Sequence, residues 1–159
     1  MIPPAIRMAL GITAALLCLA CGVSPHAQYA TYAAAESAGA VTRRWIPPYV
    51  PRSATAISEV HDLDLNTQRL RFRAPAADLR AMVDGFAHLA LEEARVAGVR
   101  SPELTGEWPG ELTPGPSSVT PRDSLRYYRA PLPGEGARCL AVEWSIQTVY
   151  AWSCRPRAT

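Results

Sequence analysis

The 159-residue chain contains no lysine, so all 16 of its permanently charged basic side chains are arginines. These arginines are spread along the chain, and 14 acidic residues nearly balance them to leave a formal net charge of +2. A nucleic-acid-binding domain would instead concentrate its basic residues in one patch or stripe. The composition therefore indicates no nucleic-acid partner, and the absence of lysine is typical of a GC-rich genome.

The familiar signatures of catalysis are also missing from the sequence. It has no G-x-S-x-G elbow, no phosphate-binding glycine loop and no Rossmann pattern. Cys139 and Cys154 lie too far apart for C-x-x-C spacing, so they indicate neither a zinc site nor thioredoxin-type redox chemistry. We therefore expect no cofactor, and the sequence leans away from an enzyme.

The first 20 residues have the pattern of an export signal. Arg7 is the only charged residue before Glu36, and it is followed by the apolar run MALGITAALLCLA from Met8 to Ala20. A positive residue before about 7–15 apolar residues is typical of a secretory signal peptide. The run is too short to span a bilayer comfortably, because a membrane-spanning helix needs about 20 residues. We predict a signal peptide over residues 1–20.

A cysteine stands directly after this run. The sequence LACG, residues 19–22, resembles a bacterial lipobox, in which a cysteine that follows a small residue receives the lipid. The resemblance implies an exported lipoprotein with palmitate on Cys21. Gly22 is not the acidic residue that retains enterobacterial lipoproteins at the inner membrane, so the outer membrane is favoured. The alternatives are cleavage after Ala20 or Ala27 without lipid, and a retained signal anchor.

The rest of the chain divides into a tether and one domain. Residues 21–42 are rich in Ala, Ser, Gly and Tyr without a steady period, which is typical of a flexible tether. Residues 43–159 have the length of a single domain. Its first segment, residues 43–53, contains three prolines that favour an extended path. Residues 101–121 contain five prolines and three glycines and are predicted to form a long surface loop.

We expect an α+β fold in which a small antiparallel sheet packs against one amphipathic helix. Residues 54–65 and 68–73 predict an N-terminal hairpin, with Leu70 and Phe72 directed inward. Residues 75–98 predict the helix, since Pro75 suits its start and Gly98 its end. Its apolar residues recur at intervals of three and four: Leu79, Met82, Val83, Phe86, Leu89, Ala90 and Ala97.

The end of the chain predicts a second hairpin and a disulfide. Residues 139–144 and 149–154 form an antiparallel pair, and residues 145–148 form its turn. If Trp144 faces Val149, Cys139 lies directly opposite Cys154, where cross-strand neighbours approach within disulfide range. An exported protein resides in an oxidising compartment, in which such a bond persists. We therefore predict a Cys139–Cys154 disulfide.

The densest polar run is EVHDLDLN, residues 59–66, which holds the weak site candidates His61, Asp62 and Asp64. Its aspartates and Asn66 resemble the opening of a calcium loop, D-x-[DN]-x-[DN]-G. An EF-hand is excluded, because Thr67 takes the place of the required glycine. A looser metal site at Asp62 and Asp64, and a general base at His61, stay as candidates. The alternative is a solvated strand face opposite Arg69, Arg71 and Arg73.

The stretch from Trp45 to Asn66 is similar to a segment of small uncharacterised bacterial exported proteins. Those proteins read W-L-P-x-x-L-P-x-S-A-T-x-I-x-E-x-H-D-x-D-x-N, and here the stretch reads WIPPYVPRSATAISEVHDLDLN. The resemblance implies a shared unit of extended segment, hairpin and helix. It supplies no catalytic residues, but it makes residues 61–66 the first place to look for a site.

Two functions follow as expectations. The leading one is a non-enzymatic envelope lipoprotein, attached to the membrane through Cys21, whose domain binds an envelope protein. The alternative is a small metal-binding or hydrolytic domain that uses His61, Asp62 and Asp64. A secreted inhibitor or immunity factor without lipid is a third possibility.

Overall fold

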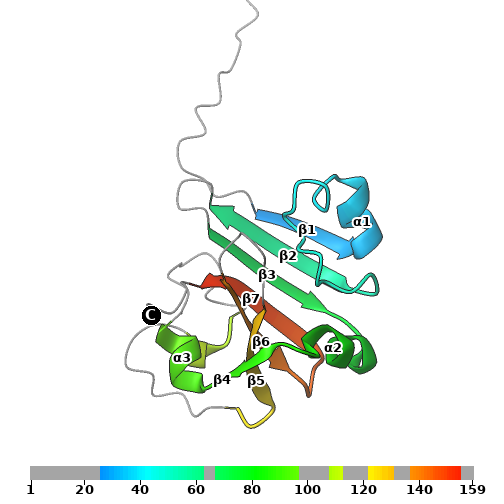
Figure 1. Ribbon diagram of the computed structural model, residues 1–159. Helices are drawn as coiled ribbons and strands as arrows, with labels where there is room; N and C mark the ends of the chain where they lie inside the picture. Colours follow the sequence, from blue (N-terminus) through cyan, green and yellow to red (C-terminus); the bar gives the residue numbers. More distant parts are fainter. Residues whose placement is uncertain (1–25, 63–66, 97–107, 113–121, 131–136, 155–159) are drawn as a thin grey trace, which may run out of the picture.

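The computed structural model describes residues 26–62, 67–96, 108–112, 122–130 and 137–154. Within these ranges the chain forms one seven-stranded sheet in the order β1-β2-β3-β7-β6-β5-β4 (Figure 1). Every neighbouring pair of strands is antiparallel. The strands are β1 His26–Thr31, β2 Thr55–Asp62, β3 Thr67–Arg73, β4 Ala87–Leu89, β5 Leu125–Ala130, β6 Ala137–Glu143 and β7 Thr148–Cys154. The helices are α1 Tyr32–Ser37, α2 Ala76–Val83, α3 Leu91–Val96 and the 3-10 helix η2 Gly110–Leu112.

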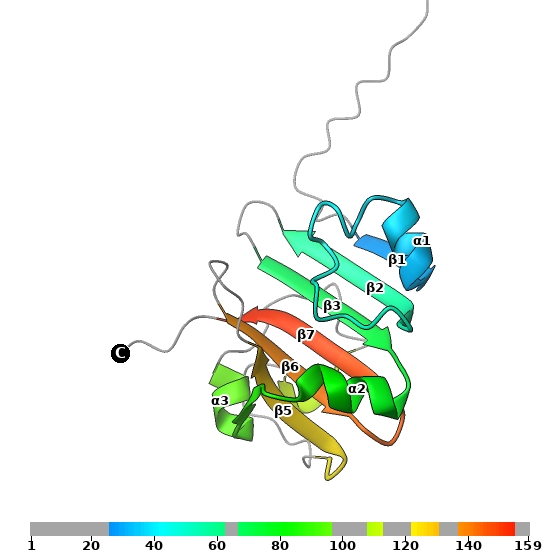
Figure 2. The same cartoon turned by 45° about the vertical axis from the view of Figure 1, so that its right-hand side comes forward.

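The sheet is built from two runs of strands that are consecutive in the chain. β1, β2 and β3 follow one another at one side of the sheet, and β4, β5, β6 and β7 follow one another at the other. The two runs meet where β3 pairs with β7. Both views place α1 beside the β1 edge and α3 beside the β4 edge, with α2 between them (Figures 1 and 2).

The expected N-terminal hairpin is present as β2 and β3. Asp62 pairs with Thr67, and Glu59 pairs with Leu70, so the strands are in register beside the turn. Leu70 and Phe72 are buried, as predicted. A bulge interrupts the pairing near Ala56, whose φ is 48°. Residues 63–66, which include the candidate Asp64, lie outside the described residues.

The segment expected to be a tether contains regular structure. From His26 onward it forms β1, which pairs with β2, and α1, whose N-terminus is capped by Thr31. Tyr32 and Ala35 are buried in the core. The segment resembles a linker in composition because β1 is a mostly exposed edge strand and the alanines bury little area each. The predicted signal peptide of residues 1–20, together with Cys21 and residues 22–25, lies outside the described residues.

The predicted fold class is wrong, because the long helix of residues 75–98 does not form. The helix α2 ends at Val83, Asp84 is extended and Gly85 takes a φ of 78°, which is a conformation that favours glycine. The chain then adds β4, which pairs with β5, and forms the short α3. The protein is thus mainly an antiparallel sheet with small helices, and not a sheet packed against one amphipathic helix.

Both faces of the sheet are covered, and we name them by their helices. The α2 face is covered by α2 and by residues 43–53, which contribute the buried Leu79, Ile46 and Val50. Its sheet residues include Leu70, Phe72, Leu140, Val142, Val149 and Ala151. The α3 face is covered by α3 and by Leu112 of η2. Its sheet residues include Leu125, Tyr127, Cys139, Ala141, Tyr150 and Trp152.

The described part of the proline-rich loop belongs to this second core. Leu112 is fully buried, and Trp108 packs its ring edge-to-face against Tyr150 and Trp152, with centroids 5.4 and 6.0 Å apart. Residues 108–112 therefore do not form the surface loop that the sequence predicts. The remainder of residues 101–121 lies outside the described residues.

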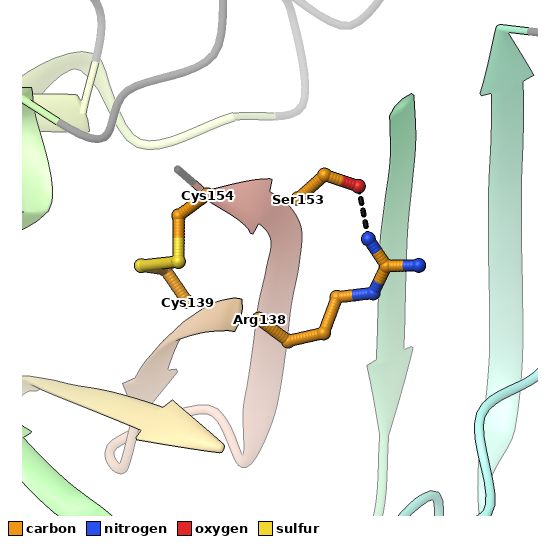
Figure 3. The surroundings of a disulfide bond; sticks show 4 residues. All are labelled: Arg138, Cys139, Ser153 and Cys154. Atoms are coloured by element: carbon orange, nitrogen blue, oxygen red, sulfur yellow. Dashed lines mark hydrogen bonds between the residues drawn. A yellow bond between two sulfur atoms is a disulfide. The ribbon is translucent and has the colours of Figure 1, made fainter. Parts of the chain in front are cut away.

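The predicted Cys139–Cys154 disulfide is confirmed, but the register that led to it is wrong. Glu143 pairs with Thr148, so the four-residue turn begins one residue earlier than expected. Cys139 consequently lies opposite Trp152, and Cys154 opposite Ala137. The cysteines are diagonal neighbours on the α3 face with a Cα–Cα distance of 5.6 Å. Figure 3 shows that Arg138 and Ser153 point to the other side of this hairpin.

We expect the double variant Cys139→Ala/Cys154→Ala to lose about 3 kcal/mol of unfolding free energy, because the bond closes a 15-residue loop in the unfolded chain. Urea unfolding with and without a thiol reductant measures this. The reductant should destabilise the wild-type protein and leave the double variant unchanged. Two alkylatable thiols at these positions in the native exported protein would contradict the prediction.

Candidate functional site

Four polar residues lie side by side across four neighbouring strands on the α2 face. His61 of β2 pairs with Gln68 of β3, and Arg138 of β6 pairs with Ser153 of β7. The backbone N–H of Gln68 donates to Ser153 Oγ at 2.9 Å, which joins the two pairs. The Arg138 guanidinium also donates to Ser153 Oγ. We call His61, Gln68, Ser153 and Arg138 the polar row.

A buried carboxyl lies beside this row, one step further into the core. Glu59 pairs with the apolar Leu70 and is only 1% exposed. Gln68 Nε2 donates to Glu59 Oε1 at 3.3 Å and also to the carbonyl of Trp45. His61 Nδ1 is 3.6 Å from Glu59 Oε1, which is too long for a hydrogen bond. The Glu59 carboxyl and the His61 imidazole thus lie close together without a hydrogen bond between them.

The surroundings shift the pKa of both groups toward their uncharged forms. Burial raises the pKa of Glu59 to about 7, against the smaller opposing effects of the Gln68 hydrogen bond and the Arg43 charge. Burial lowers the pKa of His61, and the positive charge of Arg138 lowers it further. Near pH 7 about half of Glu59 is therefore protonated, while His61 is mainly neutral.

Residues 43–53 cover the row. Trp45 places its ring 6.0 Å from the His61 ring, and the Arg43 guanidinium lies 4.2 Å from the centre of the Trp45 ring. The extended path that the sequence predicts for this segment is wrong, because the chain turns twice. The Val50 N–H donates to the Pro47 carbonyl, and the Ala54 N–H donates to the Pro51 carbonyl. Tyr49 points its hydroxyl into the protein, and burial raises the pKa of that hydroxyl well above its ordinary value.

Four buried polar atoms in and around the row have no hydrogen-bond partner. They are Tyr49 Oη, Glu59 Oε2, His61 Nδ1 and Arg138 Nε. An unsatisfied buried donor or acceptor costs about 1–3 kcal/mol, so native proteins seldom leave several of them together. This concentration of unused hydrogen-bonding capacity distinguishes the row from the apolar remainder of the α2 face.

The three candidates from the sequence do not all lie in this arrangement. His61 is part of the polar row, but Asp62 is the next residue of the same strand and lies on the opposite face of the sheet. Asp64 lies outside the described residues. Within the described ranges, no three His, Cys, Asp or Glu side chains form a group that could hold a metal ion.

No sequence pattern connects His61 with Ser153 or Arg138. These residues come together only because β3 pairs with β7, which joins segments about 80 positions apart. The alternation of side chains along a strand does place Arg138 on the face of β6 opposite to Cys139. That part of the arrangement could therefore have been predicted from the sequence.

A second buried network lies on the α3 face. Arg122 Nη1 is 3.0 Å from Glu143 Oε2, and Arg122 Nε is 3.6 Å from Glu111 Oε1. Both carboxylates are almost fully buried. Ser124 and Ser145 donate to Glu143, and together with Arg122 they lower its pKa although burial acts in the opposite direction. We call this the Arg122 bridge; it fastens η2 to the sheet.

We expect Glu59→Gln to flatten the pH dependence of stability. The folded pKa of about 7 exceeds the ordinary 4.5, so wild-type stability falls as pH rises from 4.5 through 7. Each pKa unit is worth about 1.4 kcal/mol, so wild type should lose about 2 kcal/mol more than the variant between pH 5 and 8. Urea unfolding at both pH values measures the difference.

The lowered pKa of His61 acts with the opposite sign, because it removes stability as pH falls below its ordinary value of 6.5. Glu36→Gln is the control, because Glu36 is exposed on α1, and it should follow wild type. A Glu59→Gln curve parallel to wild type would show that Glu59 ionises normally in the folded protein.

We expect Arg122→Gln to destabilise the protein by about 2 kcal/mol, because it leaves two buried carboxylates without their cation. We expect a smaller loss of unfolding free energy than for a fully buried ion pair, because the Arg122 side chain is 45% exposed. Arg126→Gln is the control, since Arg126 donates only to backbone carbonyls. Equal urea midpoints for the two variants would rule out a structural role for the bridge.

Comparison with known proteins found a family model that matches the first part of the sheet. Neither the curated proteins nor the solved structures gave a match. The matched part contains β1, α1, β2 and β3, and it ends with the last residue of β3, Arg73. It includes Glu59, His61 and Gln68 but neither Ser153 nor Arg138. Residues 24–73 match the family model of the YbbD head domain, a family of bacterial exported proteins.

Proposed function

We propose that the chain is a lipoprotein of the bacterial envelope that is attached to the membrane by lipid on Cys21 and acts by binding an envelope partner. The proposal depends chiefly on the apolar run that ends directly before Cys21 and on the match to an exported family. In this proposal the signal peptide is removed and the lipidated cysteine becomes the first residue. The protein is then attached to the outer membrane, or to a membrane with its domain facing the periplasm.

The start of β1 limits how far the domain extends from such an anchor. His26, the first residue of β1, follows Cys21 by five positions. Five residues span at most about 18 Å when fully extended. The lipid would therefore hold the β1 edge of the sheet close to the headgroups, and not at the end of the long tether that the sequence predicts.

The lipid would provide the attachment. Among the helices of the described ranges, none has both the length and the apolar character needed to cross a bilayer. Each acyl methylene buried in the membrane contributes about 0.8 kcal/mol, and a lipoprotein carries several acyl chains. Such an anchor is effectively permanent on the timescale of envelope processes.

Binding fits the polar row better than catalysis. A hydrolytic or metal site made by His61, Asp62 and Asp64 requires those side chains to converge, and strand alternation directs the first two to opposite faces. Ser153 already accepts hydrogen bonds from Gln68 and Arg138, and no general base is in contact with its hydroxyl in the described residues. The row does leave hydrogen-bonding capacity unused, at His61 Nδ1 and Arg138 Nε.

We expect palmitate labelling of cells to mark the wild-type protein and to fail with Cys21→Ala, because only Cys21 follows a small residue at the end of the apolar run. Cys18→Ala is the matched control, since it removes a cysteine of the same segment and should keep the label. Label on Cys21→Ala would show that the lipid is attached at another residue, whereas an unlabelled wild-type protein in the medium would favour a secreted factor without lipid.

A further inference from the structure

The two outer strands of the sheet differ in how well they are protected from pairing with other chains. β4 has three residues and offers only a short edge, whereas β1 has six. Within the described residues β1 pairs with β2 alone, so its other side presents unpaired N–H and C=O groups (Figure 1). Proteins usually protect such an edge with a proline, a charged side chain or a covering segment.

β1 carries none of these protections. Its sequence, HAQYAT, contains no proline, acidic residue, lysine or arginine. Four of its six residues are exposed, so no other part of the chain covers them. α1 begins directly after Thr31 and turns Tyr32 and Ala35 into the core, which restricts access at that end of the strand. The stretch that stays open is therefore residues 26–30.

We propose that β1 pairs with β1 of a second copy of this chain, in an antiparallel, two-fold symmetric arrangement that continues the sheet from one molecule into the other. A strand edge that is turned by 180° about an axis perpendicular to the sheet is complementary to itself. Centred on Gln28, the pairing places Ala27 opposite Tyr29 of the second copy, and His26 opposite Ala30 of the second copy. It thereby uses the whole of the open stretch.

The side chains of β1 favour a second copy as the occupant of this edge. Gln28 is exposed, and its amide both donates and accepts hydrogen bonds, so two facing Gln28 side chains satisfy each other. Tyr29 packs against the core of the α2 face, and Ala27 lies on the same face by strand alternation. The small Ala27 leaves room for the Tyr29 ring of the second copy. A charged side chain at the centre of the strand would instead repel its own copy.

This inference rests on the binding role proposed above and names a second copy as the partner. It does not require the lipid, although lipid on Cys21 would confine both copies to one plane and so raise their effective concentration. Palmitate labelling tests the anchor alone, so the anchor and the strand pairing can each fail while the other stands.

The test traps the strand pair covalently in cells that produce the full-length chain, because a single pair of short strands is a weak contact. Cysteines on facing residues of an antiparallel pair lie within disulfide range. In the proposed pairing Gln28→Cys faces its own copy, whereas Ala30→Cys lies about 13 Å along the strand from its copy. After mild oxidation we expect at least about 10 times more disulfide-linked dimer from Gln28→Cys than from Ala30→Cys on non-reducing gels. Wild type is the blank for the native cysteines.

A double variant checks the register without a substitution at Gln28. His26→Cys/Ala30→Cys places cysteines opposite each other in both halves of the pairing, so it should form a dimer that neither single variant forms. These positions are exposed, so the substitutions should leave the fold intact. No dimer from Gln28→Cys, equal amounts from Gln28→Cys and Ala30→Cys, or no dimer from the double variant would overturn the proposal. A crosslink from Gln28→Cys to a different envelope protein in place of the dimer would overturn it as well.

Discussion

The antiparallel pairing of β3 with β7 is the interaction on which the rest of the structure depends. It joins the three N-terminal strands to the strands that end the chain, and it makes each face of the sheet continuous. The YbbD head match ends at the last residue of β3, so the partner strand lies outside the matched segment. An unpaired β3 edge would be open to other chains.

Local alternation predicted the strands well, because a period of two follows from backbone geometry alone. It placed Leu70 and Phe72 in the core. Periodicity failed for residues 75–98, since apolar spacing does not reveal that Gly85 adopts a left-handed conformation or that β4 finds a partner in β5. It also failed for β1, whose pairing with β2 is a long-range contact of a weakly apolar segment.

The candidate site was only half visible in the sequence. His61 was selected as part of a dense polar run. Within that run Glu59 does lie beside His61, but Asp62 lies on the opposite face, and Asp64 and Asn66 are outside the described residues. The residues that lie beside His61 are set by strand register. In the β6–β7 hairpin, a register error of two residues was enough to misplace the cysteines. The raised pKa of the buried Glu59 also depends on residues 43–53, which cover it. No local sequence pattern reveals where that segment lies.

The disulfide has a consequence for the opposite face of the hairpin. Cys139 directly follows Arg138, and Cys154 directly follows Ser153, so the covalent link and the guanidinium–hydroxyl contact share the same stretch of backbone (Figure 3). The bond limits how far these two strand ends can separate at the end of the sheet. The spacing between Arg138 and Ser153 is thereby tied to the oxidation state of the hairpin, and a chain still reduced before export would lack that restraint.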